Sequence, residues 1–96
     1  MASQSAARTA TRWQRLVRER VLARLARLKS GALTIHDEAG VTTIGDPDGD
    51  LGVEAIEVRD PSFYTTLASS GAVGAGEAYV AGHWHADDVV AVLRLL

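Results

Sequence analysis

The sequence LTIHDEAGVTTI, residues 33–44, gives the clearest indication of how this chain folds. Leu33 and Ile35 alternate with more polar neighbours, as in a strand with one buried face, and residues 41–44 are β-branched throughout. Residues 37–40 (DEAG), between the two runs, are typical of a turn. The stretch therefore predicts a β-hairpin.

Downstream of the hairpin, the sequence predicts one more strand. Residues 45–50 (GDPDGD) are dense in turn-forming residues, and residues 53–58 then predict a strand with Ile56 and Val58 on its buried face. A three-stranded antiparallel sheet is the most economical arrangement of these strands.

Upstream of the hairpin, residues 12–29 contain neither Gly nor Pro and predict a helix that stops before Gly31. Its apolar residues recur at helical spacing along one arc, namely Trp13, Val17, Val21, Leu25 and Leu28. Arginines border this arc, so we expect the helix to be amphipathic and strongly basic.

The C-terminal part of the chain predicts further helices. Asp60-Pro61 is typical of a helix start, because Asp accepts free amide protons and Pro at the first helical position has none to lose. Four glycines within residues 71–82 predict a tight turn and one short helix at residues 77–81. Asp87 and Asp88 are expected to cap a final helix. The predicted fold class is α+β, with a basic N-terminal amphipathic helix, a small antiparallel sheet of about three strands, and two or three short C-terminal helices.

Length and composition favour one domain. A chain of 96 residues, 47% hydrophobic and 23% charged, is long enough for one core and too short for two. We expect residues 12–96 to form that domain and the Ala/Ser/Thr-rich residues 1–11 to be disordered.

No apolar run approaches the roughly 18–20 residues that cross a bilayer, and no signal-peptide core is present, which favours a cytoplasmic protein. The basic start also mimics a mitochondrial transit peptide, although a frayed amphipathic helix gives the same pattern.

Charge is distributed unevenly along the chain. Residues 1–30 hold eight basic residues and one acidic residue, a net of +7, whereas residues 31–96 hold two basic and eleven acidic residues, a net of −9. Each arginine near an anionic bilayer contributes about 1 kcal/mol, so we expect the basic helix to dock on anionic phospholipid at the inner face of the membrane. The predicted contact residues are Arg12, Trp13, Arg15, Arg20, Arg24 and Arg27.

Two other interpretations of the basic helix are open. Its apolar arc could pack on the sheet while its arginines pair with the acidic body of the chain. Nucleic acid would attract the same charges, but we do not expect it as a partner because the helix has no interleaved aromatic residue beyond Trp13.

Motifs that would indicate catalysis or metal binding are weak. Asp46, Asp48, Asp50 and Glu57 have the spacing of a calcium loop, but Leu51 stands where the sharp turn of that loop needs Gly. His83 and His85 are too closely spaced to settle a zinc site. The glycines of residues 71–76 follow a predicted helix rather than a strand, so they are interpreted as turn and packing positions rather than as a nucleotide loop. The chain has no Cys, which excludes disulfides, thiolate metal sites and a cysteine nucleophile. We expect neither a catalytic residue nor a metal ligand in this chain.

A longer motif runs through the C-terminal half, Gly71-x-x-Gly74-x-Gly76-Glu77-Ala78-Tyr79-x-x-Gly82-x-Trp84, and is preceded by Asp60-Pro61-x-Phe63-Tyr64. On these residues, the chain over residues 12–96 resembles the N-terminal domain of cyclopropane-fatty-acyl-phospholipid synthases. His83 departs from the family, in which many members have an acidic or aromatic residue before the tryptophan.

The resemblance implies a function for the chain as an accessory domain. Members of the family join a small N-terminal domain to a larger S-adenosylmethionine-binding domain, which adds a methylene group across a cis double bond of a phospholipid acyl chain. Their cofactor and bicarbonate sites lie in the larger domain, so the resemblance implies no cofactor and no enzyme activity for this chain alone. It implies instead a lipid-gripping domain that supports a methyltransferase domain in cis or in trans, with self-association as an open alternative.

The motif residues are expected to make an interdomain contact or to have a structural role. They are Gly74, Gly76, Glu77, Tyr79, Gly82 and Trp84. The alternative function is a free-standing small lipid carrier or adaptor with an internal apolar pocket.

Overall fold

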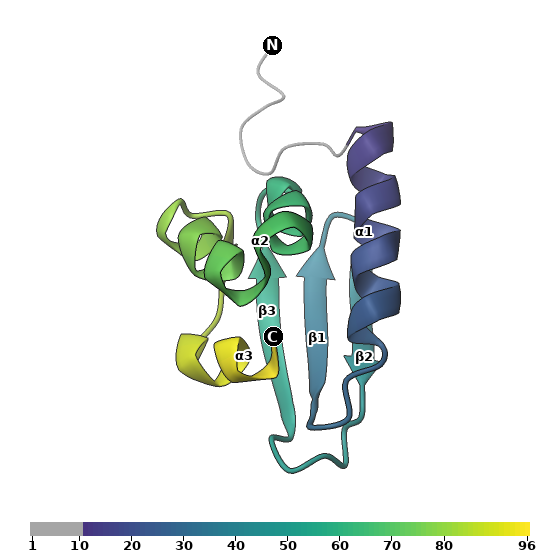
Figure 1. Ribbon diagram of the computed structural model, residues 1–96, viewed down its shortest axis with the longest axis vertical. Coiled ribbons are helices and arrows are strands. Elements are labelled where there is room, and N and C mark those ends of the chain that lie inside the picture. Colours follow the sequence, from purple (N-terminus) through teal and green to yellow (C-terminus); the bar gives the residue numbers. More distant parts are fainter. Residues whose placement is uncertain (1–10) are drawn as a thin grey trace.

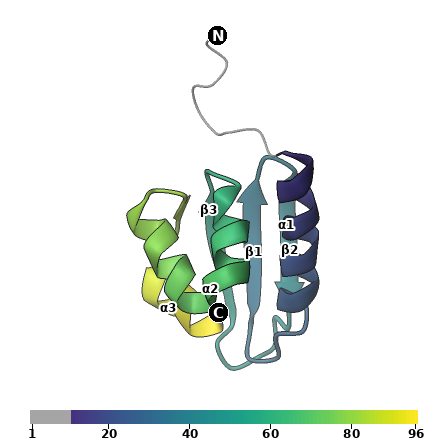
Figure 2. The same ribbon diagram turned by 45° about the horizontal axis from the view of Figure 1, so that its top comes forward.

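The computed structural model describes residues 11–96, which form a four-stranded mixed sheet and three helices (Figure 1). The elements are α1 (Arg12–Leu25), β1 (Ala32–Asp37), β2 (Gly40–Gly45), β3 (Val53–Val58), α2 (Ser62–Val80), β4 (Trp84–His85) and α3 (Val89–Leu95). All three helices lie over the same face of the sheet, as the two views in Figures 1 and 2 both show. The predicted α+β class is confirmed.

The predicted three-stranded antiparallel sheet is wrong in part. The hairpin of β1 and β2 is present, with Leu33 opposite Ile44, and the strand order is β2-β1-β3-β4. However, β3 runs parallel to β1, with Ile35 opposite Ile56, and β4 adds a short fourth strand antiparallel to β3. The predicted buried face of β3 is confirmed, because Ile56 and Val58 are both in the core.

The loop between β2 and β3 explains the parallel pairing. It passes beneath the start of β1, where the Leu51 N–H donates to the Ser30 carbonyl at 2.7 Å and the Ala32 N–H donates to the Gly52 carbonyl at 2.8 Å. Gly31 has no room for a side chain here, because a Cβ atom would lie 2.6 Å from the Gly52 carbonyl oxygen. The chain therefore leaves the loop beside the start of β1 and continues in the same direction.

Helix α1 starts with a capping box. The Thr11 hydroxyl accepts from the Gln14 N–H at 3.1 Å, and the Gln14 side chain accepts from the Thr11 N–H at 3.0 Å. Thr11 thus has a defined place despite the predicted disorder of residues 1–11, whose remaining part lies outside the described residues. The helix ends at Leu25 rather than at residue 29, because residues 26–28 tighten into turns that lead to β1.

Helix α2 is longer than predicted and is bent at Gly71. This residue has φ 59° and ψ −140°, a conformation that is strained for a residue with a side chain. Residues 72–80 then continue as helix, although the glycines predicted only a short helix at residues 77–81. The two halves of α2 approach closely at Gly74, where a Cβ atom would lie 2.5 Å from the Thr66 carbonyl oxygen.

Capping residues define the ends of α2 and α3. The Asp60 carboxylate accepts from the Ser62 N–H at 2.9 Å, and Pro61 already has helical dihedral angles. At the other end of α2, Gly82 has φ 81° and its N–H donates to the Tyr79 carbonyl at 2.9 Å, as in a Schellman motif. Asp88 caps α3 by accepting from the N–H of residue 91 at 3.0 Å, which confirms one of the two predicted caps.

The core lies between the inner face of the sheet and the helices. Its fully buried large side chains are Trp84, Tyr64, Phe63, Leu33, Ile35, Ile56 and Val92. Phe63 packs against Tyr64 and Trp84, with ring centroids 5.1 and 5.7 Å apart. The Trp84 Nε1–H donates to the Ala75 carbonyl at 2.8 Å, which ties β4 to the second half of α2.

Candidate functional site

The outer side of α1 combines exposed apolar and basic side chains. Trp13 is 65% exposed and Leu16 is 46% exposed, whereas Val21 and Leu25 are buried in the core. The apolar arc predicted for this helix therefore divides into two parts. Val21 and Leu25 of that arc pack inside the domain, whereas Trp13 is exposed, and Leu16, which was not part of the predicted arc, is exposed as well.

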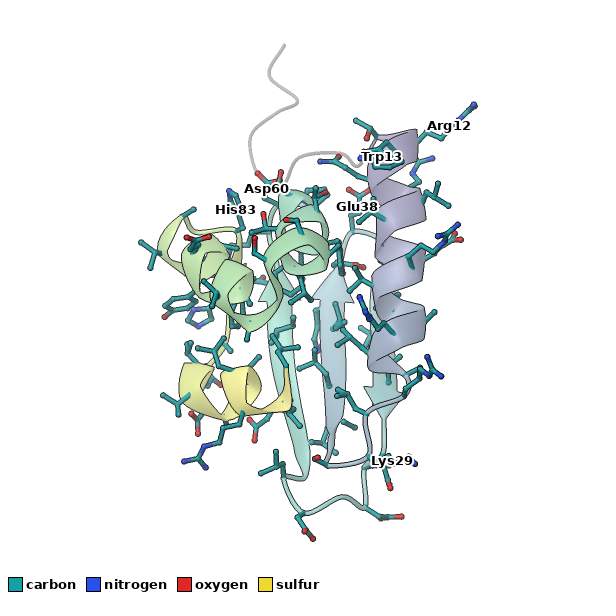
Figure 3. All side chains as sticks on the ribbon, viewed as in Figure 1. Arg12, Trp13, Lys29, Glu38, Asp60 and His83 are labelled. Atoms are coloured by element: carbon teal, nitrogen blue, oxygen red, sulfur yellow. The ribbon has the colours of Figure 1, made fainter. Side chains whose placement is uncertain are left out.

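Most of the α1 arginines have no acidic partner in the part of the chain that the structure describes. Among residues 11–96, no carboxylate lies within ion-pair distance of Arg12, Arg15, Arg20, Arg24 or Arg27. All of the predicted contact residues except Arg27 lie on α1, and Arg27 lies in the turn beyond it. Figure 3 shows Arg12 and Trp13 at one end of the helix and Lys29 beyond its other end. The alternative in which the arginines pair with the acidic body describes Arg18 but not these five residues.

Three of the predicted contact residues share one side of the helix. At 3.6 residues per turn, Trp13, Arg20 and Arg24 lie within an arc of about 40° around the axis of α1. Both arginines reach the edge of α1 that faces α2, because they line the groove between these helices.

The groove between α1 and α2 is open to solvent and has a volume of about 440 Å³. It is lined by Arg20, Val21, Arg24, Leu25, Leu67, Ala68, Gly71, Ala72 and Leu96. Among residues 11–96, the charged side chains that line it are the two arginines of α1, and the small residues of α2 leave space beside the bend of that helix. The groove thus combines an apolar surface with positive charge along one edge.

A second cluster, of two charged side chains and a tyrosine, is partly buried and was not predicted from the sequence. The Arg18 Nε–H donates to Asp37 Oδ2 at 2.7 Å, and the Tyr64 hydroxyl donates to the same oxygen at 2.5 Å. The Ala39 N–H donates to Asp37 Oδ1 at 3.0 Å, and the Asp37 side chain is only 4% exposed. The Arg18 guanidinium also lies 5.8 Å from the centre of the Tyr64 ring.

The pKa values in this cluster follow from its hydrogen bonds. Burial opposes ionisation of Asp37, but the hydrogen bonds from Arg18 and Tyr64 and the charge of Arg18 outweigh it and lower the pKa of the carboxyl group. Burial and the hydrogen bond to Asp37 raise the pKa of the Tyr64 hydroxyl. At neutral pH the carboxylate is therefore charged and the hydroxyl is a neutral donor. The cluster joins α1, β1 and α2 and serves as a structural clamp.

The spacing of residues in the sequence contains a signal for this clamp. Arg18 lies three and seven residues before Val21 and Leu25, so it shares the inner side of the helix with them. Asp37 continues the alternation of Leu33 and Ile35 and therefore faces the helices. Opposite charges on two buried faces would have predicted the ion pair.

The motif residues of the C-terminal half lie on or next to the second half of α2. Gly74 and Trp84 are buried, Glu77 is exposed, and the Tyr79 ring packs edge-to-face on Trp84 with centroids 5.3 Å apart. The Glu77 side chain has no hydrogen-bond or ion-pair partner among residues 11–96. The structure therefore brings the motif together as the second half of α2, the turn that follows it and β4, and Gly71 at the start of the motif also lines the groove.

The two histidines that flank Trp84 face different carboxylates. His83 Nε2 lies 3.9 Å from Asp60 Oδ2, and His85 Nε2 lies 3.8 Å from Asp87 Oδ1. Figure 3 labels His83 and Asp60. The Nδ1 atom of His83 is buried and has no hydrogen-bond partner within residues 11–96. In this part of the chain no three His, Cys, Asp or Glu residues are grouped as metal ligands.

None of the helices within residues 11–96 combines the length and the apolar character that crossing a bilayer requires. Comparisons of the chain with protein-family models, with curated proteins and with solved structures found no match.

Proposed function

We propose that residues 12–96 form a non-catalytic domain of the cyclopropane-fatty-acid-synthase type, which docks on anionic phospholipid and supports a methyltransferase domain. One observation supports the docking above all others: α1 has four arginines without a carboxylate partner among residues 11–96, and the exposed side chains of Trp13 and Leu16 lie on the same helix. These four are Arg12, Arg15, Arg20 and Arg24. At about 1 kcal/mol each near an anionic surface, they would supply several kcal/mol, which suits reversible docking.

In the proposed docking, α1 stays packed on the sheet of the domain. Val21 and Leu25 belong to the core, so a helix that detached from the sheet would expose them to water. Trp13 and Leu16 are free to enter the interface, where a tryptophan ring contacts both apolar and polar groups. The domain therefore lies on the membrane as a rigid body, at the inner face of the bilayer.

Co-sedimentation with vesicles tests the docking. We expect the protein to bind vesicles that contain phosphatidylglycerol, to bind phosphatidylcholine vesicles far less, and to lose binding as the salt concentration rises. The double variant Arg12→Gln/Arg20→Gln should bind more weakly than Arg59→Gln/Arg94→Gln, which removes the same charge away from α1. Equal binding to both vesicle types, or equal loss in both variants, would overturn the proposal.

The fluorescence of Trp13 gives an independent readout. Trp84 is 1% exposed, so a blue shift on adding vesicles would report on the exposed Trp13. Trp13→Phe should abolish the shift and keep the fold.

The methyltransferase part of the proposal rests on the motif from Gly71 to Trp84. Such an enzyme would bring S-adenosylmethionine in its own catalytic domain, in cis or in trans. The coding sequence that follows Leu96 and the neighbouring genes test this part. An S-adenosylmethionine-binding domain there supports it, and its absence from both would count against it.

A further inference from the structure

The groove between α1 and α2 has the features of a site for one lipid chain. We infer that it binds an acyl chain of an anionic phospholipid, with the phosphate group held between Arg20 and Arg24. This inference rests on the proposed docking and adds a bound lipid molecule to it.

The shape and lining of the groove fit an acyl chain. Its volume of about 440 Å³ lies within the range of roughly 300–1,000 Å³ that small-molecule sites occupy. Val21, Leu25, Leu67 and Leu96 contribute apolar surface, and an acyl chain placed on it leaves no hydrogen-bonding group without a partner.

The charges at the groove select an anionic head group. Arg20 and Arg24 are one helical turn apart, so their Cβ atoms are about 5–6 Å from each other and both guanidinium groups can reach one phosphate. Neither is engaged by a carboxylate among residues 11–96. The α2 side of the groove adds no charge, so positive charge stands on one side of an apolar surface. This asymmetry matches a molecule with an anionic head and an apolar tail.

A peptide fits the same groove less well. One turn of a helix about 10 Å wide and 5.4 Å long already occupies roughly 420 Å³, so the groove could hold little more than a single turn. An extended peptide would need main-chain hydrogen bonds, and the groove is flanked by two helices rather than by the free edge of a strand.

The position of the groove is consistent with membrane docking. Trp13 shares its side of α1 with both groove arginines, so docking through Trp13 brings the groove to the level of the lipid head groups. A lipid chain could then leave the bilayer for the groove without crossing bulk water.

Binding of a soluble short-chain lipid, without any bilayer, tests the inference. The probe is dihexanoyl phosphatidylglycerol below its critical micelle concentration, observed through the NMR signals of methyl groups. We expect saturable shifts confined to the methyl groups that line the groove, which are those of Val21, Leu25, Leu67, Ala68, Ala72 and Leu96. Dihexanoyl phosphatidylcholine keeps the charged phosphate but has no net charge. It should bind at least about tenfold more weakly than the phosphatidylglycerol, because hydrogen bonds to the phosphate alone do not make up for the lost net charge. Glycerophosphoglycerol, which lacks the chains, should cause no shift in these methyl groups.

Variants with matched controls locate the site. Ala68→Leu/Ala72→Leu fills the groove with exposed side chains and should abolish binding, whereas Ala23→Leu enlarges an exposed alanine of α1 outside the groove and should not. Arg20→Gln/Arg24→Gln should weaken binding at least about tenfold. Arg12→Gln/Arg15→Gln removes the same charge from the same helix and should leave affinity within about twofold.

The outcomes separate this inference from the docking proposal. Vesicle binding without saturable binding of the short-chain lipid would overturn the inference and leave the docking intact. Binding of the short-chain lipid without vesicle binding would overturn the docking and leave a lipid-carrying groove. Equal effects of the two arginine pairs, or a dimer that protects the groove methyl groups from the lipid, would overturn the inference.

Discussion

The variant Tyr64→Phe tests how strongly the clamp of Arg18, Asp37 and Tyr64 stabilises the domain. In Tyr64→Phe the ring keeps its contact with Phe63, but Asp37 Oδ2 loses the donor that lies 2.5 Å away. A hydrogen bond to a charged group contributes about 1.5–3 kcal/mol, and the Asp37 side chain is 4% exposed, so water replaces the donor poorly. We expect the free energy of unfolding to fall by about 2 kcal/mol and Tm by about 8–16 °C.

A double-mutant cycle with Asp37→Asn shows whether the stability lost in Tyr64→Phe comes from the hydrogen bond between Tyr64 and Asp37. Asp37→Asn leaves the guanidinium of Arg18, which is 19% exposed, without its anionic partner, at an expected cost of about 3 kcal/mol. In that background Tyr64→Phe removes at most a neutral hydrogen bond, so its cost should drop to about 1 kcal/mol or less. The two changes are then expected to be non-additive by about 1 kcal/mol.

The pH dependence gives a second measure of the same group. The pKa of Asp37 is lower in the folded protein than in the unfolded chain, because the hydrogen bonds from Arg18 and Tyr64 outweigh burial. The unfolded chain therefore binds the proton more readily, and stability falls as the pH drops below about 4 through the folded-state pKa. Asp37→Asn should lose less stability than the wild type over this range. The pKa of Tyr64 is instead higher in the folded protein than in the unfolded chain, so the unfolded chain loses this proton first. The contribution of Tyr64 to stability should therefore be lost as the pH rises above about 10.

Urea unfolding followed by circular dichroism is the assay for the cycle and the pH series. Tyr79→Phe is the matched control, because the Tyr79 hydroxyl has no hydrogen-bond partner among residues 11–96 and should cost less than about 0.5 kcal/mol. Additive effects of Tyr64→Phe and Asp37→Asn, or equal acid sensitivity of Asp37→Asn and the wild type, would contradict the clamp.

Four further predictions concern the second half of α2 and the residues that follow it. Gly74→Ala should lower the free energy of unfolding by about 1–3 kcal/mol in a urea titration, because its Cβ would meet a backbone carbonyl at 2.5 Å. Gly76→Ala, with open space around its Cβ in a helical segment, should instead raise it by about 0.5–1 kcal/mol, and a loss of stability would contradict the described packing. Gly82→Ala should cost about 1 kcal/mol in the same titration because residue 82 has φ 81°. Trp84→Phe should lower Tm by several degrees, since it removes the hydrogen bond to Ala75 and leaves a void, and an unchanged Tm would argue against that bond.

Periodicity predicted the elements of the sheet better than their pairing. Alternation over β1 and β3 identified the buried sides, which depend only on neighbouring residues. Whether β3 pairs parallel or antiparallel to β1 depends on how residues 46–52 cross the start of β1, and strand periodicity contains no information about that. With only Trp84 and His85, β4 is too short for a periodic pattern.

Glycine content led to a wrong prediction for the second half of α2. Glycine lowers helix propensity by about 1 kcal/mol per residue, which favoured a turn over residues 72–76. In the fold, Ala75 and Ala78 are buried, and Gly74 allows the two halves of the helix to approach each other. Tertiary packing thus stabilises a helix that local propensity does not favour.

The charge of the candidate site could be foreseen, but its shape could not. The spacing of the arginines in the sequence predicts a basic side of α1 directly. The groove exists because Leu67 and Ala68 of α2 lie across from Val21 and Leu25 of α1, and that distance depends on the packing of both helices on the sheet. Sequence reasoning therefore indicated the charge of the proposed partner but not the groove in which we place its apolar part.

Packing explains only some of the motif residues on which the proposed relation to cyclopropane synthases rests. Gly74 permits a close approach, Gly82 adopts a left-handed conformation, and Trp84 fills the core and bonds to α2. Packing within the domain does not explain Gly76 or Glu77. A Cβ atom at Gly76 would meet nothing within 4 Å, and the carboxylate of Glu77 has no partner among residues 11–96. If a second domain packs on this one, as the proposed function requires, we expect it to approach α2 at Gly76 and to meet the charge of Glu77, on a surface separate from the groove.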